Sequence, residues 1–292
     1  MGRHIKLKEN MYNLEEKVYE KAKDIYGDPL SDEVKDRLDR EFKYIRKYDQ
    51  EKYFIFYSEL IRLANLKPYE FYFRGTVGNS LIAYLCDMTE FDPMDDEYNL
   101  SEYFLSTGNL KFHMDISMNK YDEICYEEIV NELPGVASFK FDEYDPVHAF
   151  LIPEEGCESD EEEIKGTYKE RYDFLTLMHN DSLTQISESV ENGRAPAFKS
   201  GLIGRAMTID DVFESALEYG IEPEKAAKIA EIIGGIGTNP EDKTKAIDIL
   251  VEAGADEDFV DYCKKVEYLW TRAGRMNIST IQKRMEFYNL GY

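Results

Sequence analysis

The chain is poor in cysteine and has no long apolar run. Its four cysteines, Cys86, Cys125, Cys157 and Cys263, lie far apart and form no CxxC pair. This spacing argues against a zinc site and indicates reduced thiols. The sequence also shows no signal peptide and no stretch of about 18 apolar residues. We therefore expect a cytoplasmic protein that does not enter a membrane.

Basic residues are far fewer than acidic ones. There are 35 Lys and Arg residues against 60 Asp and Glu, a formal charge of -25 over 292 residues. So acidic a chain repels phosphate at long range and loses the counterion release that drives nucleic-acid binding, so the case for a nucleic-acid partner is weak. Aromatic residues are plentiful, with 22 Tyr and 16 Phe, which excludes a disordered acidic tail.

The order of periodic segments and breakers predicts an α+β fold. We expect helices first, then a small α/β unit with a mixed sheet, then a helical bundle, with boundaries at 1–68, 69–190 and 191–292. Ser31 is a predicted N-cap, and Thr208 with Asp211 resembles a capping box. The expected helices cover 13–26, 31–48, 51–64, 79–87 and hairpins from 208 onward, and the expected strands cover 70–73, 110–118, 138–141 and 148–152.

The stretch LKFHMDISM, Leu110–Met118, alternates polar and apolar residues without a break. On a strand, His113 and Asp115 would share one face, about 7 Å apart. Enzymes that use two metal ions present paired carboxylates in this way, although one member here is a histidine. The alternative is the solvated face of a sheet with no ligand.

A glycine turn, RGTVGNS, precedes the helix expected at 79–87. Backbone N–H groups at such a turn suit a triphosphate, and Asn79 and Ser80 add side-chain hydrogen bonds. The alternative is an ordinary β–α turn in which Asn79 caps the helix. The candidate phosphate-binding residues are Arg74, Gly75, Thr76, Gly78, Asn79 and Ser80.

The segment from Lys264 to Arg284 carries six bases and a single acid, Glu267. Two interpretations stay open for it. It forms a phosphate-facing helix pair that presents Arg272 and Arg275, or it docks as a basic patch on the acidic body of the same protein.

Together these motifs resemble the polymerase core of the bacterial DNA polymerase III alpha subunit of the PolC type. The resemblance starts near Glu15, is sharpest at Arg74–Ser80, which is similar to the family's SRGSVGSS element, and resumes at Tyr268–Tyr292. It implies a nucleotidyltransferase-like palm for 69–190 and a fingers-like bundle for 191–292. It also implies a phosphate role for Gly75, Gly78 and Ser80 and a metal role for Asp115.

The departures from the family pattern bear on catalysis. His113 stands where the family has its first aspartate, and Met178 where it has its third, with Asp173 and Asp181 close by in the sequence. The family's Lys-Ala-His becomes Arg272-Ala273-Gly274. Histidine and methionine are poor magnesium ligands and bring no negative charge to hold two divalent ions.

We therefore expect a degenerate, catalytically inactive PolC-like core that acts by binding a nucleotide or a protein partner. No cofactor is certain, and Mg or Mn enters only if activity remains. One alternative is residual DNA-directed DNA polymerase activity with Mg or Mn, with Asp115 and the degenerate His113 as the catalytic pair. A second is an acidic decoy that mimics DNA. The oligomeric state is left open.

Overall fold

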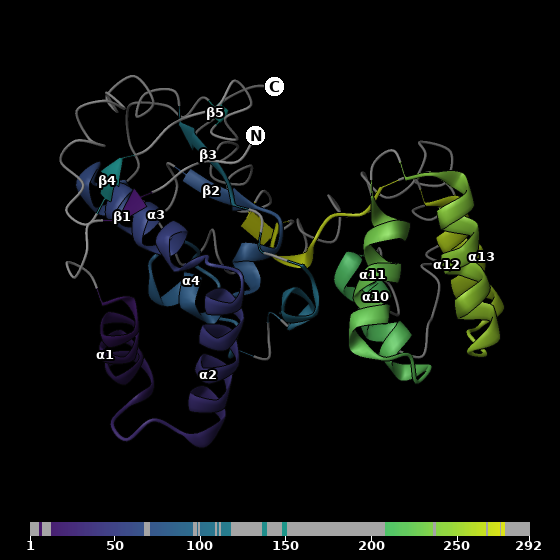
Figure 1. Cartoon of the computed structure of the whole chain (residues 1–292), viewed down its shortest axis with the longest axis horizontal. Helices are drawn as coiled ribbons and strands as arrows, with labels where there is room; N and C mark the ends of the chain where they lie inside the picture. The colour runs from purple at the N-terminus through teal and green to yellow at the C-terminus, as the bar shows by residue number, and fades with distance from the viewer. Residues whose placement is uncertain are drawn as a thin grey trace, which may run out of the picture. The chain divides into compact units, whose positions relative to one another are not determined.

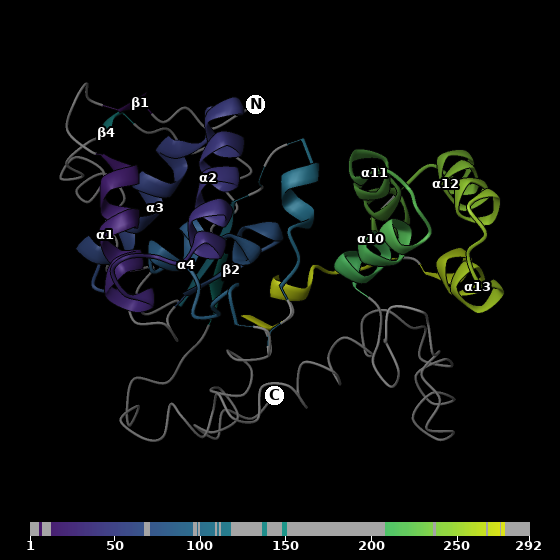
Figure 2. The ribbon, with the colours of Figure 1, turned by 90° about the horizontal axis from the view of Figure 1, so that it is seen from below.

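The computed structural model divides the chain into two compact units, each considered by itself (Figures 1 and 2). Unit 1 comprises Met1–Asn99, Gly108–Asp160 and Thr280–Tyr292; unit 2 comprises Leu100–Thr107 and Glu161–Ser279. The structure describes residues 6–7, 13–66, 71–95, 98, 100–108, 110, 112–117, 136–138, 148–150, 208–235, 238–266, 268–274 and 276–277. It describes by backbone alone residues 6–7, 74, 113, 115–117, 136–138 and 148–150.

Three helices near the start of unit 1 match the predicted ones. They are α1 (Leu14–Tyr26), α2 (Asp32–Lys47) and α3 (Glu51–Leu63). The Ser31 hydroxyl accepts from the backbone N–H of Val34 at 3.3 Å, which confirms the predicted N-cap. Gly27 separates α1 from α2. Its φ of +92° is a backbone conformation that glycine adopts without a steric penalty.

Unit 1 also contains two small sheets. One pairs β1 (Lys6–Leu7) antiparallel with β4 (Val136–Ser138). The other has the order β2-β3-β5, in which β2 is antiparallel and β5 parallel to β3. Its strands are β2 (Phe71–Arg74), β3 (His113–Ser117) and β5 (His148–Phe150).

One face of the β2-β3-β5 sheet packs on α3. Phe73 and Met114 are fully buried and lie opposite each other in register. The ring of Tyr57 on α3 meets Phe73 edge-on at 5.1 Å and stacks on Phe112 at 5.7 Å. The apolar half of the alternating LKFHMDISM pattern therefore forms core, as the period of two predicts. The regular strand itself begins at His113, later than expected.

A side chain outside the sheet fixes the approach to β3. The amide of Gln50, which is 3% exposed, donates to the carbonyl of Leu110 at 2.9 Å and accepts from its N–H at 3.2 Å. These two bonds replace ladder bonds for a residue that precedes the strand, since buried backbone groups need partners.

Unit 2 is helical in its described part. Besides the short 3-10 helix η2 (Tyr103–Ser106), it contains α10 (Ile209–Glu218), α11 (Pro223–Gly234), α12 (Pro240–Glu252) and α13 (Glu257–Lys265). The capping box between Thr208 and Asp211 is present in both directions, as predicted. Pro223 and Pro240 each occupy a first helical position, where the missing N–H costs nothing.

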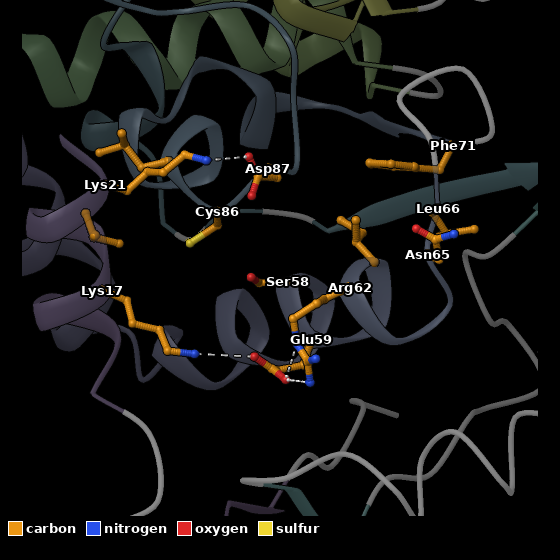
Figure 3. Close-up of a pocket in the computed structure, with 13 residues that line it drawn as sticks. Lys17, Lys21, Ser58, Glu59, Arg62, Asn65, Leu66, Phe71, Cys86 and Asp87 are labelled. Atoms are coloured by element: carbon orange, nitrogen blue, oxygen red, sulfur yellow. Dashed lines mark hydrogen bonds and ion pairs between the residues drawn. The ribbon is translucent and has the colours of Figure 1, made fainter. Parts of the chain in front are cut away.

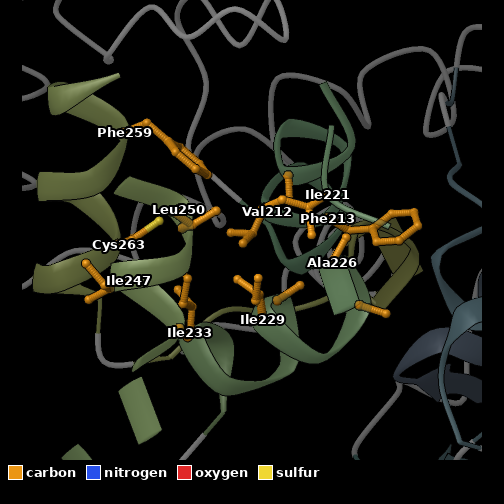
Figure 4. Close-up of a cluster of buried hydrophobic side chains, with 14 of the residues drawn as sticks. Val212, Phe213, Ile221, Ala226, Ile229, Ile233, Ile247, Leu250, Phe259 and Cys263 are labelled. Carbon is orange, nitrogen blue, oxygen red and sulfur yellow. The ribbon is translucent and has the colours of Figure 1, made fainter. Parts of the chain in front are cut away.

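The core of unit 2 lies between the helices of these hairpins (Figure 4). Phe259 and Leu250 are fully buried, and Val212 and Ile229 extend the same cluster toward α10 and α11. Tyr103 of η2 packs its ring against Phe213 at 5.5 Å. The loop that carries η2 is thereby anchored in this unit through aliphatic and aromatic burial.

Helices outweigh strands among the described residues, and this composition is compatible with the predicted α+β class. The nucleotidyltransferase palm and the boundary at 68/69 stay predictions. The boundary at 190/191 lies outside the described residues. None of the described helices has the length and apolar character needed to cross a membrane.

Candidate phosphate turn and the neighbouring strand face

The predicted phosphate turn follows β2 directly. Gly75 adopts φ +85° and ψ -156°, a region that is essentially reserved for glycine. The chain then forms the 3-10 helix η1 (Thr76–Asn79) and enters α4 (Leu81–Leu85). Gly75 and Thr76 are partly exposed, whereas Asn79 and Ser80 are fully buried. Within the described turn, solvent therefore reaches the first residues and not the last ones.

The N-terminus of α4 is occupied by a carboxylate of the protein itself. The side chain of Glu41, on α2, is 0% exposed. It accepts from the Ser80 hydroxyl at 2.6 Å, from the N–H of Leu81 at 2.8 Å and from the N–H of Ile82 at 3.1 Å. Ser80, and not Asn79, is the N-cap, and its hydroxyl accepts from Ala83. The helix dipole and first N–H groups are thus neutralised internally.

Arg37 balances the buried charge of Glu41. Its Nε donates to the carboxylate at 2.6 Å, and its Nη2 donates to the carbonyl of Asn79 at 2.7 Å. Arg37 is 5% exposed, so the pair is shielded from solvent. A buried pair survives only when its remaining hydrogen-bonding groups are satisfied, as they are here. Arg37 and Glu41 therefore clamp the turn onto α2.

The register of the sheet brings the two predicted motifs together. Arg74, the last residue of β2, pairs with His113, and Tyr72 pairs with Asp115. The turn therefore begins one residue beyond the position opposite His113. His113 and Asp115 alternate with the buried Phe112 and Met114, which places both positions on the face away from α3.

The third strand adds a residue that sequence spacing could not place. On β5, His148 pairs in parallel register with Asp115. Adjacent strands lie about 4.8 Å apart. The backbone register therefore sets His113, Asp115 and His148 at neighbouring positions of the sheet. Two of these three residue types are histidine, whereas magnesium ions need several hard oxygen ligands.

Among residues with described side chains, no three His, Cys, Asp or Glu form a group able to hold a metal ion. The side chains of Arg74, His113 and Asp115 are not among them. Arg275 and Met178, with the nearby Asp173 and Asp181, lie outside the described residues. Their predicted roles stay predictions.

Arg272 is placed differently from a phosphate-facing residue. Its side chain is 1% exposed and donates to Asp211 at 2.5 Å and to Glu214 at 2.8 Å. Burial alone would lower the pKa of Arg272, but the two carboxylates raise it well above its ordinary value. In unit 2 this arginine follows the second interpretation of the basic segment, that of docking on acidic groups of the same protein.

A second contact extends the same cluster. Asp210 accepts from the backbone N–H of Arg272 at 2.7 Å and from the hydroxyl of Ser101 at 2.6 Å. The buried carboxylate of Asp210, at the start of α10, therefore binds both the loop that carries η2 and the backbone at Arg272. Burial raises the pKa of Glu214 in this cluster even though Arg272 opposes the shift.

Sequence reasoning missed Arg37, Glu41 and Gln50. One signal was present for the first two. Together with Val34, Leu38 and Ile45 they follow the spacing of the buried stripe of α2, so two charged residues stand at core positions. Charged residues at such positions are almost never fully buried unless they are paired.

Comparison with known proteins finds similarity in the N-terminal region of the chain. Residues 12–142, less than half of the chain, match the family model described as the bacterial DNA polymerase III alpha NTPase domain. Curated relatives carry the name DNA polymerase III PolC-type. The protein from Lactococcus lactis subsp. lactis is 36% identical over 84 residues, which cover 29% of this chain and 5% of that protein.

Two further relatives agree. The PolC-type polymerase of Streptococcus mutans serotype c is 36% identical over 126 residues, covering 39% of this chain and 8% of that protein. The PolC-type polymerase of Thermotoga petrophila is 34% identical over 82 residues, which cover 28% of this chain and 6% of that protein. The predicted resemblance to PolC-type polymerases is confirmed for the matched region. The match spans only a small fraction of the length of these relatives.

Proposed function

We propose that the chain is a non-catalytic relative of the PolC core that binds the phosphate groups of a nucleotide at Gly75 and Thr76. The observation that carries the proposal is the pairing of Arg74 with His113. It places a histidine, where the family has an aspartate, beside the strand end from which the turn starts. Asp115 lies two residues farther along β3 and away from the turn.

The exchange of a carboxylate for an imidazole acts in two directions. It removes a negative charge next to the place where phosphates would bind, so less repulsion opposes a nucleotide that comes without metal. It also removes one of the hard oxygen ligands that two-metal catalysis needs. The same exchange therefore favours metal-independent binding and opposes nucleotidyl transfer. Asp115 is a surviving ligand position of this disarmed site.

The Glu41 clamp restricts where phosphate contacts can form. Because Leu81 and Ile82 already donate to Glu41, a phosphate has the partly exposed Gly75 and Thr76 as its contacts on the described turn. A nucleotide bound there contacts fewer N–H groups than at an open helix N-terminus. We expect modest affinity.

The test is a titration of a fluorescent deoxynucleoside triphosphate, paired with primer extension in Mg²⁺ and in Mn²⁺. Thr76→Glu should weaken nucleotide binding about tenfold through charge repulsion at short range. Thr244→Glu adds the same charge on α12, where the residue is exposed, and should change nothing. No templated incorporation is expected. Incorporation abolished by Asp115→Ala contradicts the proposal, as does nucleotide binding that is indifferent to Thr76→Glu.

A further inference from the structure

Unit 1 contains a cavity of about 530 Å³ that shares no residue with the turn. It lies between α1, α3 and the end of α4 (Figure 3). Its volume falls in the range of about 300–1,000 Å³ that is usual for small-molecule sites. The charges, the apolar surface and the hydrogen-bonding groups of its lining indicate which kind of molecule it accepts.

The charged groups of the lining are already paired with one another. Glu59 is 5% exposed and forms ion pairs with Lys17 at 3.5 Å and with Arg62 at 2.7 Å. Lys21 forms an ion pair with Asp87 at 3.4 Å. An ion that entered the cavity would lose hydration without gaining an unpaired counter-charge, which costs free energy. The lining therefore favours a ligand without charge.

The most buried part of the lining is apolar. Val18 of α1, Phe71 of β2 and Leu85 of α4 are each at most 6% exposed. Apolar surface of a ligand that packs against these side chains is removed from water, and this is favourable in proportion to the area buried. The cavity therefore suits a molecule with an apolar body.

Two polar groups of the lining make no hydrogen bond within the described part of the chain. They are the hydroxyl of Ser58, on α3, and the thiol of Cys86, which follows α4. Both lie in the space between α1 and α3 in Figure 3. Burial raises the pKa of the Cys86 thiol to about 12, so the thiol keeps its proton near neutral pH and is a weak donor. The hydroxyl of Ser58 is the stronger donor, and both groups suit a ligand that accepts a hydrogen bond.

We propose that this cavity binds a small uncharged organic molecule, an apolar ring or chain that carries one carbonyl group. The carbonyl oxygen accepts a hydrogen bond from the hydroxyl of Ser58. The apolar body packs against Val18, Phe71 and Leu85. A carbonyl group accepts a hydrogen bond without carrying a charge, so it meets both conditions that the lining sets. The inference does not rest on the proposed nucleotide function.

Three probes with one ring system and different charges test it: the neutral ketone acetonaphthone, naphthoate and naphthylmethylammonium. Each is titrated into the full chain while the backbone amide NMR signals of Asn65 and Asp87, both at the cavity, are followed. Acetonaphthone should shift these signals in a saturable way and bind at least about threefold more tightly than either ion. Equally tight binding of an ion overturns the proposal, as does the absence of any shift with millimolar acetonaphthone.

Matched variants locate the carbonyl group. Ser58→Ala should weaken acetonaphthone binding about threefold, as expected for the loss of one neutral hydrogen bond. Ser106→Ala should leave it unchanged. Ser106 is likewise partly exposed, and its hydroxyl makes no hydrogen bond within the described residues, but it does not line the cavity.

A third variant tests the place of the apolar body. Ser58→Leu puts a larger side chain into the cavity at a partly exposed position of α3 and should abolish acetonaphthone binding. Acetonaphthone binding that survives Ser58→Leu overturns the proposal, as do equal effects of Ser58→Ala and Ser106→Ala.

Discussion

The buried carboxylate of Glu41 accepts a hydrogen bond from the hydroxyl of Ser80 at 2.6 Å, across 39 positions of sequence. This contact joins α2 to the glycine turn that the PolC resemblance singles out. It also satisfies the first N–H groups of α4, which have no partner within the helix.

Glu41→Gln should destabilise unit 1 by about 3 kcal/mol or more, because it leaves the buried guanidinium of Arg37 without a counter-charge. The measurement is the free energy of unfolding in urea, with hydrogen exchange at the amides of Leu81 and Ile82. Lys35→Gln, a change at a partly exposed position of the same helix, should alter stability by less than about 0.5 kcal/mol. Equal effects of the two substitutions contradict the clamp.

Gly75→Ala should cost about 1–3 kcal/mol, since φ +85° with ψ -156° is strained for any residue with a Cβ. Gly108→Ala is the matched control, because a Cβ there meets no atom within 4 Å. Thermal unfolding of the three proteins measures the difference. A stability unchanged by Gly75→Ala would show that the turn does not hold this backbone conformation.

Gln50→Leu should cost about 1–3 kcal/mol by leaving both backbone groups of Leu110 buried without their side-chain partner. The amide of Leu110 should lose protection in hydrogen exchange, while amides within α1 keep theirs. Retained protection at Leu110 contradicts a structural role for Gln50.

The stability of unit 2 should depend on pH through Glu214. Burial raises the pKa of Glu214, so the native state favours the protonated carboxyl. The protonated carboxyl therefore adds to the free energy of unfolding at low pH. This added stability is lost as pH rises from the ordinary glutamate pKa of about 4.3 through the raised pKa. Glu214→Gln imitates the protonated form. The variant should therefore match wild type at low pH and become the more stable of the two as pH rises.

The measurement is the unfolding of unit 2 at several pH values, followed by the signal of Trp270, the single tryptophan. Glu218→Gln provides the control, since Glu218 is exposed on the same helix. The account of Glu214 is wrong if the stability difference between Glu214→Gln and wild type stays constant from low to neutral pH, or if Glu218→Gln gives the same trend.

Local signals predicted the helices and their ends. The caps at Ser31 and at Thr208 with Asp211 use partners within four residues, and Pro240 acts through its own ring. Signals as local as these can be recognised in the sequence alone. The alternation around Met114 likewise predicted which positions of β3 would be core.

The sequence did not predict the long-range polar contacts. The bonds from Glu41 to Ser80 and from Gln50 to Leu110 span 39 and 60 positions and follow no period. The same holds for Arg272, whose partners Asp211 and Glu214 lie about 60 positions earlier. Composition showed an excess of acids, but not which of them would surround this arginine. The pairing of His148 with Asp115 required the parallel register of β5.

The metal dependence of nucleotide affinity in wild type and in His113→Asp tests the central claim most directly. We predict that wild type binds a deoxynucleoside triphosphate equally well in EDTA and in Mg²⁺. His113→Asp, which restores a carboxylate beside Asp115, should bind more weakly in EDTA and recover in Mg²⁺. Affinity of the wild type that rises tenfold or more with Mg²⁺ would contradict the account.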